Sequence, residues 1–70
     1  MNIQCVFGAN VRHFREAKGW SQDQLSEMSG LHRTYISGIE RGVRNPTVKI
    51  VHEIAVALEI KVGQLFEGVI

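Results

Sequence analysis

The apolar residues of this chain recur at helical spacing, in short segments that glycine interrupts. Phe7, Val11 and Phe14 stand at i, i+4 and i+7, which places their side chains on one face of an α-helix. A glycine follows each of the first three segments, at Gly19, Gly30 and Gly42. Strand-like alternation is absent. We therefore predict a compact all-α fold of five helices, over about residues 7–18, 22–29, 31–41, 48–58 and 62–67.

Composition fits one small globular domain. Of the 70 residues, 44% are hydrophobic and 21% are charged. No apolar run approaches the roughly 20 residues of a membrane-spanning helix, and residues 1–10 lack the pattern of a secretory signal. The single cysteine, Cys5, allows no internal disulfide. We expect one cytoplasmic domain over residues 1–70, with no membrane partner.

Residues 22–41 have the organisation of a helix-turn-helix. Ser21 and Gln24 have the spacing of a capping box that begins the first helix, with Leu25 and Met28 expected to face inward. Gly30 provides the turn, and a small residue, Ser26, stands where the two helices should approach most closely. Apolar residues suited to bury both helices against a third are Leu25, Leu31, Ile36 and Ile39.

The second of these helices has an unusual exposed face. Its buried side is set by Ile36 and Ile39, and the opposite side carries Thr34, Ser37, Gly38 and Arg41, with Arg33 on the flank. Arginine can bind a guanine edge through two hydrogen bonds, and hydroxyls can contact any base edge. Gly38 costs about 1 kcal/mol relative to alanine in a helix, and we expect close approach of its backbone to DNA to offset that cost.

Charge is unevenly distributed although the formal net charge is only +1. Residues 31–50 carry four cations against one carboxylate, a balance of +3, whereas residues 51–70 carry one cation against three carboxylates, a balance of −2. A local basic face is what phosphate binding requires. The middle of the chain is therefore the expected DNA-binding region.

Residues 22–41 resemble the helix-turn-helix of the lambda-repressor/Cro-like (xenobiotic-response-element) family, and the likeness extends over about residues 7–66. The stretch Leu31-His-Arg-Thr-Tyr-Ile-Ser-Gly-Ile-Glu-Arg41, followed by Arg44-Asn45, is especially similar to controller proteins of restriction–modification systems. Such controllers are small homodimeric regulators. The resemblance implies a lambda-repressor-like DNA-binding domain with its helix-turn-helix at the second and third helices.

The resemblance also implies roles for individual residues. Base contacts are expected from Arg33, Thr34 and Ser37. His32, at the start of the recognition helix, is expected to contact a base or a phosphate, with exposure to solvent as the alternative. Backbone or flanking contacts are expected from Gln22, Tyr35, Arg41, Arg44, Asn45 and Thr47. Lys49 joins this set because a cation in the first turn of a helix is disfavoured unless an anion such as a phosphate lies nearby. An ordinary surface lysine is the alternative there.

Two further expectations follow from the resemblance. The family pairs an arginine of the first helix with an acidic residue late in the recognition helix, which implies a structural ion pair between Arg15 and Glu40. The family often has glycine after the fourth helix where this chain has Glu59, and Gly63 weakens the short last helix. The resemblance therefore does not fix the exact geometry of residues 59–67, and these differences lie away from the DNA-binding face.

The C-terminal apolar residues exceed what one small core can absorb. They are Val62, Leu65, Phe66, Val69 and Ile70. We expect them to form a homodimer interface within a dimerisation region at about residues 59–70, with packing in the subunit's own core as the alternative. Two-fold symmetry would place two recognition helices one DNA turn apart, roughly 34–36 Å, as on a palindromic operator.

These observations predict a sequence-specific transcriptional regulator that binds double-stranded DNA as a homodimer, and the resemblance implies a restriction–modification controller. An antitoxin-type protein, which binds a toxin and autoregulates its operon, is the alternative. His13, His32 and His52 lack the i, i+4 spacing of a helical metal site, and the chain has no catalytic triad or phosphate loop. We therefore expect no metal, no cofactor, no small-molecule ligand and no enzymatic activity.

Overall fold

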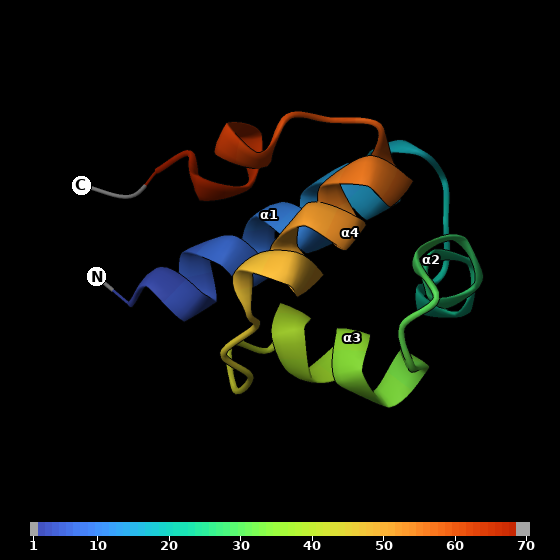
Figure 1. Ribbon diagram of the computed structural model, residues 1–70, viewed down its shortest axis with the longest axis horizontal. Helices are drawn as coiled ribbons and strands as arrows, with labels where there is room; N and C mark the ends of the chain where they lie inside the picture. Colours follow the sequence, from blue (N-terminus) through green and yellow to red (C-terminus); the bar gives the residue numbers. More distant parts are fainter. Residues whose placement is uncertain (1, 69–70) are drawn as a thin grey trace.

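Four α-helices and one 3-10 helix make up the structure, a computed structural model that describes residues 2–68. They are, in chain order, α1 (Ile3–Ala17), α2 (Gln22–Ser29), α3 (Arg33–Glu40), α4 (Val48–Leu58) and η1 (Val62–Phe66). Helices α1 and α4 lie against each other in the middle, α3 crosses below them, α2 closes one end, and η1 covers α1 (Figure 1). Residues 2–68 contain no strand, which confirms the all-α class.

The predicted fifth α-helix is wrong in type, because residues 62–66 form a 3-10 helix. Five residues can close few of the i to i+4 hydrogen bonds of an α-helix, and short segments commonly adopt the tighter turn. The side chain of Asn10 fastens this segment to α1 by donating to the carbonyl oxygens of Leu65 and Glu67, both at 2.9 Å.

Helix α1 begins at Ile3, earlier than the predicted start at Phe7. Asn2 is the cause, since its side-chain oxygen accepts hydrogen bonds from the backbone N–H groups of Gln4 (2.8 Å) and Cys5 (3.4 Å). The predicted capping box of α2 is present: the Ser21 N–H donates to the Gln24 side chain at 2.7 Å, and the Gln24 N–H donates to the Ser21 hydroxyl at 3.1 Å.

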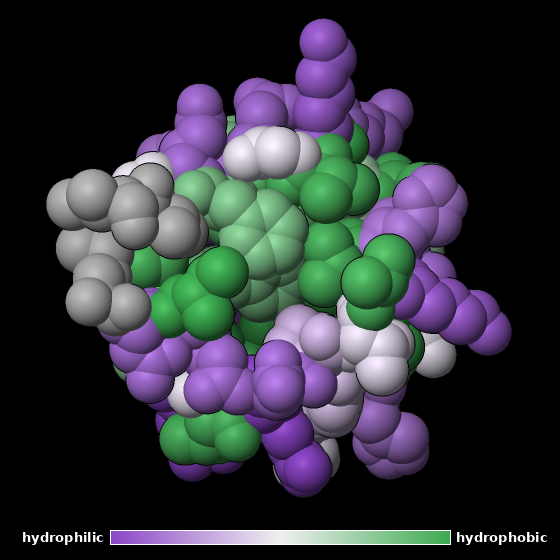
Figure 2. Space-filling view, turned by 60° about the vertical axis from the view of Figure 1, so that its left-hand side comes forward, coloured by the Kyte–Doolittle hydropathy of each residue, from purple (hydrophilic) through white to green (hydrophobic). Residues whose placement is uncertain are grey.

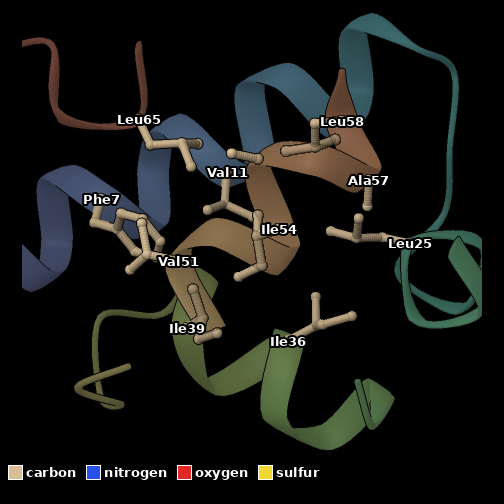
Figure 3. Close-up of a cluster of buried hydrophobic side chains, with 11 residues drawn as sticks. Phe7, Val11, Leu25, Ile36, Ile39, Val51, Ile54, Ala57, Leu58 and Leu65 are labelled. Atoms are coloured by element: carbon tan, nitrogen blue, oxygen red, sulfur yellow. The ribbon is translucent and has the colours of Figure 1, made fainter. Parts of the chain in front are cut away.

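One hydrophobic core joins all five elements (Figure 3). Its largest fully buried side chains are Val11, Leu25, Ile36, Ile39, Ile54, Leu58 and Leu65. Because these residues come from every helix, the orientation of α3 depends on the packing of the whole chain.

Two sequence expectations about burial are wrong. Leu65 was expected at a dimer interface, but its side chain is fully buried inside the subunit, where η1 closes the core over α1 and α4. Met28 was expected to face inward, but it is 60% exposed. The inner stripe of α2 runs through Gln22, Leu25 and Ser29, and at about 100° per residue Met28 falls outside it.

The chain leaves α4 through a left-handed residue that is not glycine. Glu59 has φ 59°, a conformation that costs a residue with a side chain more than it costs glycine. Its carboxylate accepts from the Lys18 ammonium at 2.7 Å, and this contact lowers the pKa of Glu59. The departure from the family's glycine is therefore accompanied by an ion pair that ties the end of α4 to the end of α1.

Candidate nucleic-acid interface

Hydroxyl groups fasten the turn between α2 and α3. Gly30 caps α2 in the left-handed conformation, with φ 77°. The Ser26 hydroxyl donates to the Leu31 carbonyl oxygen, and the Ser29 hydroxyl donates to the Leu25 carbonyl oxygen at 2.7 Å. Ser26 is therefore both a small residue at the helix crossing and a direct hydrogen-bond partner of the turn. The Ser29 hydroxyl also accepts from the Leu31 N–H at 3.2 Å, so two serines of α2 hold both the carbonyl oxygen and the N–H of Leu31, which leads into α3.

The predicted ion pair between Arg15 and Glu40 is present, and it holds the far end of α3. The Arg15 guanidinium donates to both Glu40 carboxylate oxygens, at 2.7 Å from Nε and 3.0 Å from Nη2, and its Nη1 donates to the Trp20 carbonyl at 2.7 Å. The Arg15 and Glu40 side chains are only 10% and 4% exposed. The hydrogen bond to Glu40 raises the pKa of Arg15.

Gln22 belongs to the same network. Its side-chain nitrogen donates to the Glu40 carboxylate at 3.1 Å, so the start of α2, the end of α3 and the last turn of α1 meet at one carboxylate. Gln22 was predicted to contact the DNA backbone. The structure shows that one end of its amide already has a partner within the protein.

The predicted base-reading residues lie on the outer side of α3 and at its start. His32, Arg33 and Thr34 are exposed and Ser37 is half-buried, while Ile36 and Ile39 on the opposite side are in the core. Arg41 follows the helix and is exposed; its Nε donates to the Ser37 carbonyl at 3.4 Å. The sequence therefore places its arginine and hydroxyl side chains on the solvent side of a helix whose other side is fixed.

Asp23 is a member of this surface that the sequence analysis missed. Its carboxylate lies 3.2 Å from Nε of Arg33, and both side chains are largely exposed. The pair joins the first turn of α2 to the first turn of α3. A helical spacing rule does not reveal it, because such rules relate residues of one helix. Only the packing angle between the two helices brings the groups together.

The expectation for Gly38 is wrong. It was predicted to lie bare on the exposed face, but it is buried because the side chain of Arg44 crosses it. The Arg44 guanidinium carbon lies 5.6 Å from the centre of the Tyr35 ring, within the range of a cation–π contact. Arg44 thus lies along one flank of α3, and Arg33 lies on the other flank, beside α2.

Polar residues of the loop before α4 complete the surface. The Thr47 hydroxyl caps α4 by accepting from the Ile50 N–H at 3.3 Å. Asn45 and Lys49 are exposed, and the first turn of α4 contains no acidic residue. The helix dipole and Lys49 therefore both place positive charge at this end of α4, which suits an anion such as a phosphate.

Residues 2–68 lack two kinds of feature, a membrane-spanning helix and a metal site. No helix there is both long and apolar enough to cross a membrane. No three His, Cys, Asp or Glu side chains within the same range come together in a way that could hold a metal ion.

Known proteins are similar to this chain in sequence and in fold. The control protein C.SmaI from Serratia marcescens is 45% identical over 65 residues, which cover 93% of this chain and 77% of that protein. The crystal structure of the restriction-modification controller protein C.AhdI from Aeromonas hydrophila matches with a TM-score of 0.87 at 43% identity, over 90% of this chain and 96% of that one.

A third match was solved on DNA. The crystal structure of the restriction-modification controller protein C.Esp1396I as a tetramer in complex with its natural 35 base-pair operator has a TM-score of 0.86 at 37% identity, over 96% of this chain and 88% of that chain.

The family comparison covers most of the chain. The helix-turn-helix family profile HTH_3 matches residues 11–65, from the middle of α1 to η1. Together with the controller proteins above, it confirms the resemblance inferred from the recognition helix. The chain therefore belongs to the helix-turn-helix family HTH_3.

Proposed function

We propose that this protein is a sequence-specific transcriptional regulator that binds double-stranded DNA as a homodimer on a palindromic operator, as a restriction–modification controller. The observation that carries the proposal is the outer side of α3, where arginine and hydroxyl side chains lie exposed on a helix fixed by the core and the Arg15–Glu40 ion pair. The relative C.Esp1396I, bound to its operator, supports the same mode of action. The comparisons do not favour the antitoxin alternative, and we place the regulator in the cytoplasm, with the DNA.

In this proposal, α3 enters the major groove. Arg33, Thr34, Ser37 and His32 read base edges, because they occupy the exposed side and the start of α3. The DNA backbone is contacted by Gln22, Tyr35, Arg41, Arg44, Asn45, Thr47 and Lys49. Backbone contacts fix the register of the protein on the duplex, and the base contacts choose the sequence.

Replacing Arg33 with alanine tests the base-reading role. We expect the affinity for a duplex selected from random DNA to fall by about 1–3 kcal/mol, with relaxed preference at one base pair, because a guanine edge loses both hydrogen bonds. Arg12→Ala is the matched control, since Arg12 is equally exposed but lies on α1 in a surface pair with Glu16. Binding is measured by titration at fixed salt.

The result for unrelated DNA separates the two possible roles of Arg33. A base contact predicts a much smaller loss on a duplex of unrelated sequence than on the selected duplex. An equal loss on both duplexes would show that Arg33 contacts phosphate, and it would contradict the role given to Arg33 here.

The proposed dimer surface is an apolar hollow beside η1. It is lined by Pro46, Val48, Val51, His52, Val62 and Phe66. Val48 is 88% exposed and Val62 is 40% exposed, and Figure 2 shows apolar side chains gathered on this end of the molecule. A second copy of the chain would cover them. The proposed interface differs from the one expected from the sequence, residues 59–70, because it also includes residues of α4. Leu65 is not part of it because its side chain is fully buried, and Val69 and Ile70 lie outside the described residues.

Val62→Asp tests this surface. A carboxylate at the centre of an apolar interface would be desolvated without a partner, so we expect monomers in sedimentation and weak binding to the selected duplex. Met28→Asp is the control, because Met28 is also exposed but belongs to α2, at the opposite end of the molecule (Figure 1). A Val62→Asp protein that sediments as a dimer would refute the proposed interface.

A further inference from the structure

The side chain of Arg44 occupies the space that any other residue at position 38 would need. A Cβ atom built on Gly38 would lie 2.7 Å from Cγ, 3.2 Å from Nε and 3.5 Å from Cδ of Arg44. The first of these distances is too short for a real Cβ atom, so alanine at position 38 would displace the arginine. Glycine weakens a helix relative to alanine. Only glycine at position 38 leaves room for the Arg44 side chain to lie against the backbone of α3.

Tyr35 forms the second wall of the same contact. It precedes Gly38 by three residues, so the two lie on one flank of α3. The Arg44 guanidinium carbon lies 5.6 Å from its ring centre. The Tyr35 ring is partly buried against the core, which fixes its position. We call the Tyr35 ring and the bare backbone at Gly38 the arginine seat.

The backbone of the loop is fixed beside this seat. The N–H of Val43 donates to the Gly38 carbonyl at 3.0 Å, and the N–H of Gly42 donates to the Ile39 carbonyl at 3.0 Å. The residue before Arg44 is therefore bonded directly to the glycine on which the Arg44 side chain lies. Both the backbone and the stem of the arginine have defined positions before any ligand binds.

We propose that Gly38 and Tyr35 are positioning residues that hold Arg44 beside the recognition helix, so that its guanidinium meets a DNA phosphate with the side chain already ordered. This inference rests on the proposed function, in which Arg44 contacts the DNA backbone. A free arginine side chain loses much rotamer entropy when it is fixed by a ligand. An arginine that the seat already holds loses less rotamer entropy when it binds the phosphate, and this smaller loss gives a higher affinity for DNA.

The first test needs no DNA. Protons over the face of an aromatic ring shift upfield in the NMR spectrum. The guanidinium carbon of Arg44 lies 5.6 Å from the Tyr35 ring centre, so the proton on the neighbouring Nε should resonate upfield of its position in an unstructured chain. Gly38→Ala and Tyr35→Leu should abolish this shift, and Tyr35→Phe, which keeps the ring, should retain it. An unchanged Arg44 shift in the Gly38→Ala protein would overturn the proposal.

The second test is a double-mutant cycle for binding to a random-sequence duplex at low salt, which reports backbone contacts without knowledge of the operator. Arg44→Ala should weaken binding about tenfold, the size of one charge-assisted hydrogen bond. Gly38→Ala alone should weaken DNA binding about three- to tenfold. In the Arg44→Ala background the same change should weaken binding by less than about twofold, because no arginine then occupies the seat. An equal loss in both backgrounds would overturn the proposal.

Thermal stability distinguishes positioning from damage. Gly38→Ala should leave the melting temperature unchanged or raise it, because alanine favours the helix and the exposed Arg44 can swing away. A melting temperature that falls in step with affinity would show general damage and refute the positioning role. If Arg44→Ala itself leaves affinity unchanged, the proposed backbone contact fails; if only Gly38→Ala has no effect, the seat alone fails.

Discussion

Replacing Glu40 with alanine should lower the free energy of unfolding by about 3–5 kcal/mol, because the change leaves a buried guanidinium without its partner. Arg15 is 10% exposed and donates two of its hydrogen bonds to Glu40, and Gln22 donates a third bond to the same carboxylate. In a domain of this size each kcal/mol corresponds to about 4–8 °C in melting temperature. The variant should therefore be largely unfolded well below the native melting temperature.

The matched control is Glu16→Ala. Glu16 also pairs with an arginine, Arg12, at 3.2 Å, but these two side chains are 54% and 64% exposed. Exposed pairs contribute about 0–1 kcal/mol, so this variant should melt close to the native protein. Both are measured by chemical denaturation at one protein concentration, since dimerisation would make stability concentration-dependent. Equal losses from Glu40→Ala and Glu16→Ala would contradict the structural role given to the buried pair.

Gly8→Ala should be nearly as destabilising, for a different reason. A Cβ atom there would lie 2.1 Å from the backbone oxygen of Ile39 and 3.1 Å from two backbone atoms of Glu40. Backbone atoms cannot rotate away as a side chain can, so α1 and α3 would have to move apart. We expect a loss of about 3 kcal/mol, the upper end of the range for overpacking in a core.

Gly63→Ala provides the control for this substitution. Apart from its own turn of chain, no other part of residues 2–68 would lie within 4 Å of a Cβ at position 63. The same chemical change should therefore leave the unfolding free energy nearly unchanged, or raise it slightly by restricting the unfolded chain. A Gly8→Ala protein as stable as Gly63→Ala would show that α1 and α3 do not approach as closely as described.

The sequence was sufficient to predict the helices because their signals are local. Helical spacing of Phe7 and Val11, the capping box at Ser21 and the cap at Thr47 act within a few residues of chain. The start of α1 was predicted late, although Asn2 before Ile3 is a readable capping signal. The resemblance to the lambda-repressor/Cro-like family predicted the Arg15–Glu40 pair, which links residues 25 positions apart.

Features that depend on the packing between elements could not be predicted. The spacing of apolar residues places Leu65 on the apolar face of the C-terminal segment. It does not show whether that face packs in the subunit's own core or against a partner subunit. The sequence shows that Gly38 is costly in a helix, but not that Arg44 fills the space above it. The pairing of Asp23 with Arg33 likewise depends on the angle between α2 and α3.

The central claim is sequence-specific reading of DNA by a symmetric dimer. Selection of binding sites from random duplex DNA at physiological salt tests it most directly, because affinity without a stated salt concentration has no meaning. The account predicts a palindromic consensus with half-sites about one helical turn apart, roughly 10 base pairs from centre to centre. A failure to enrich any sequence, or a consensus without two-fold symmetry, would contradict it.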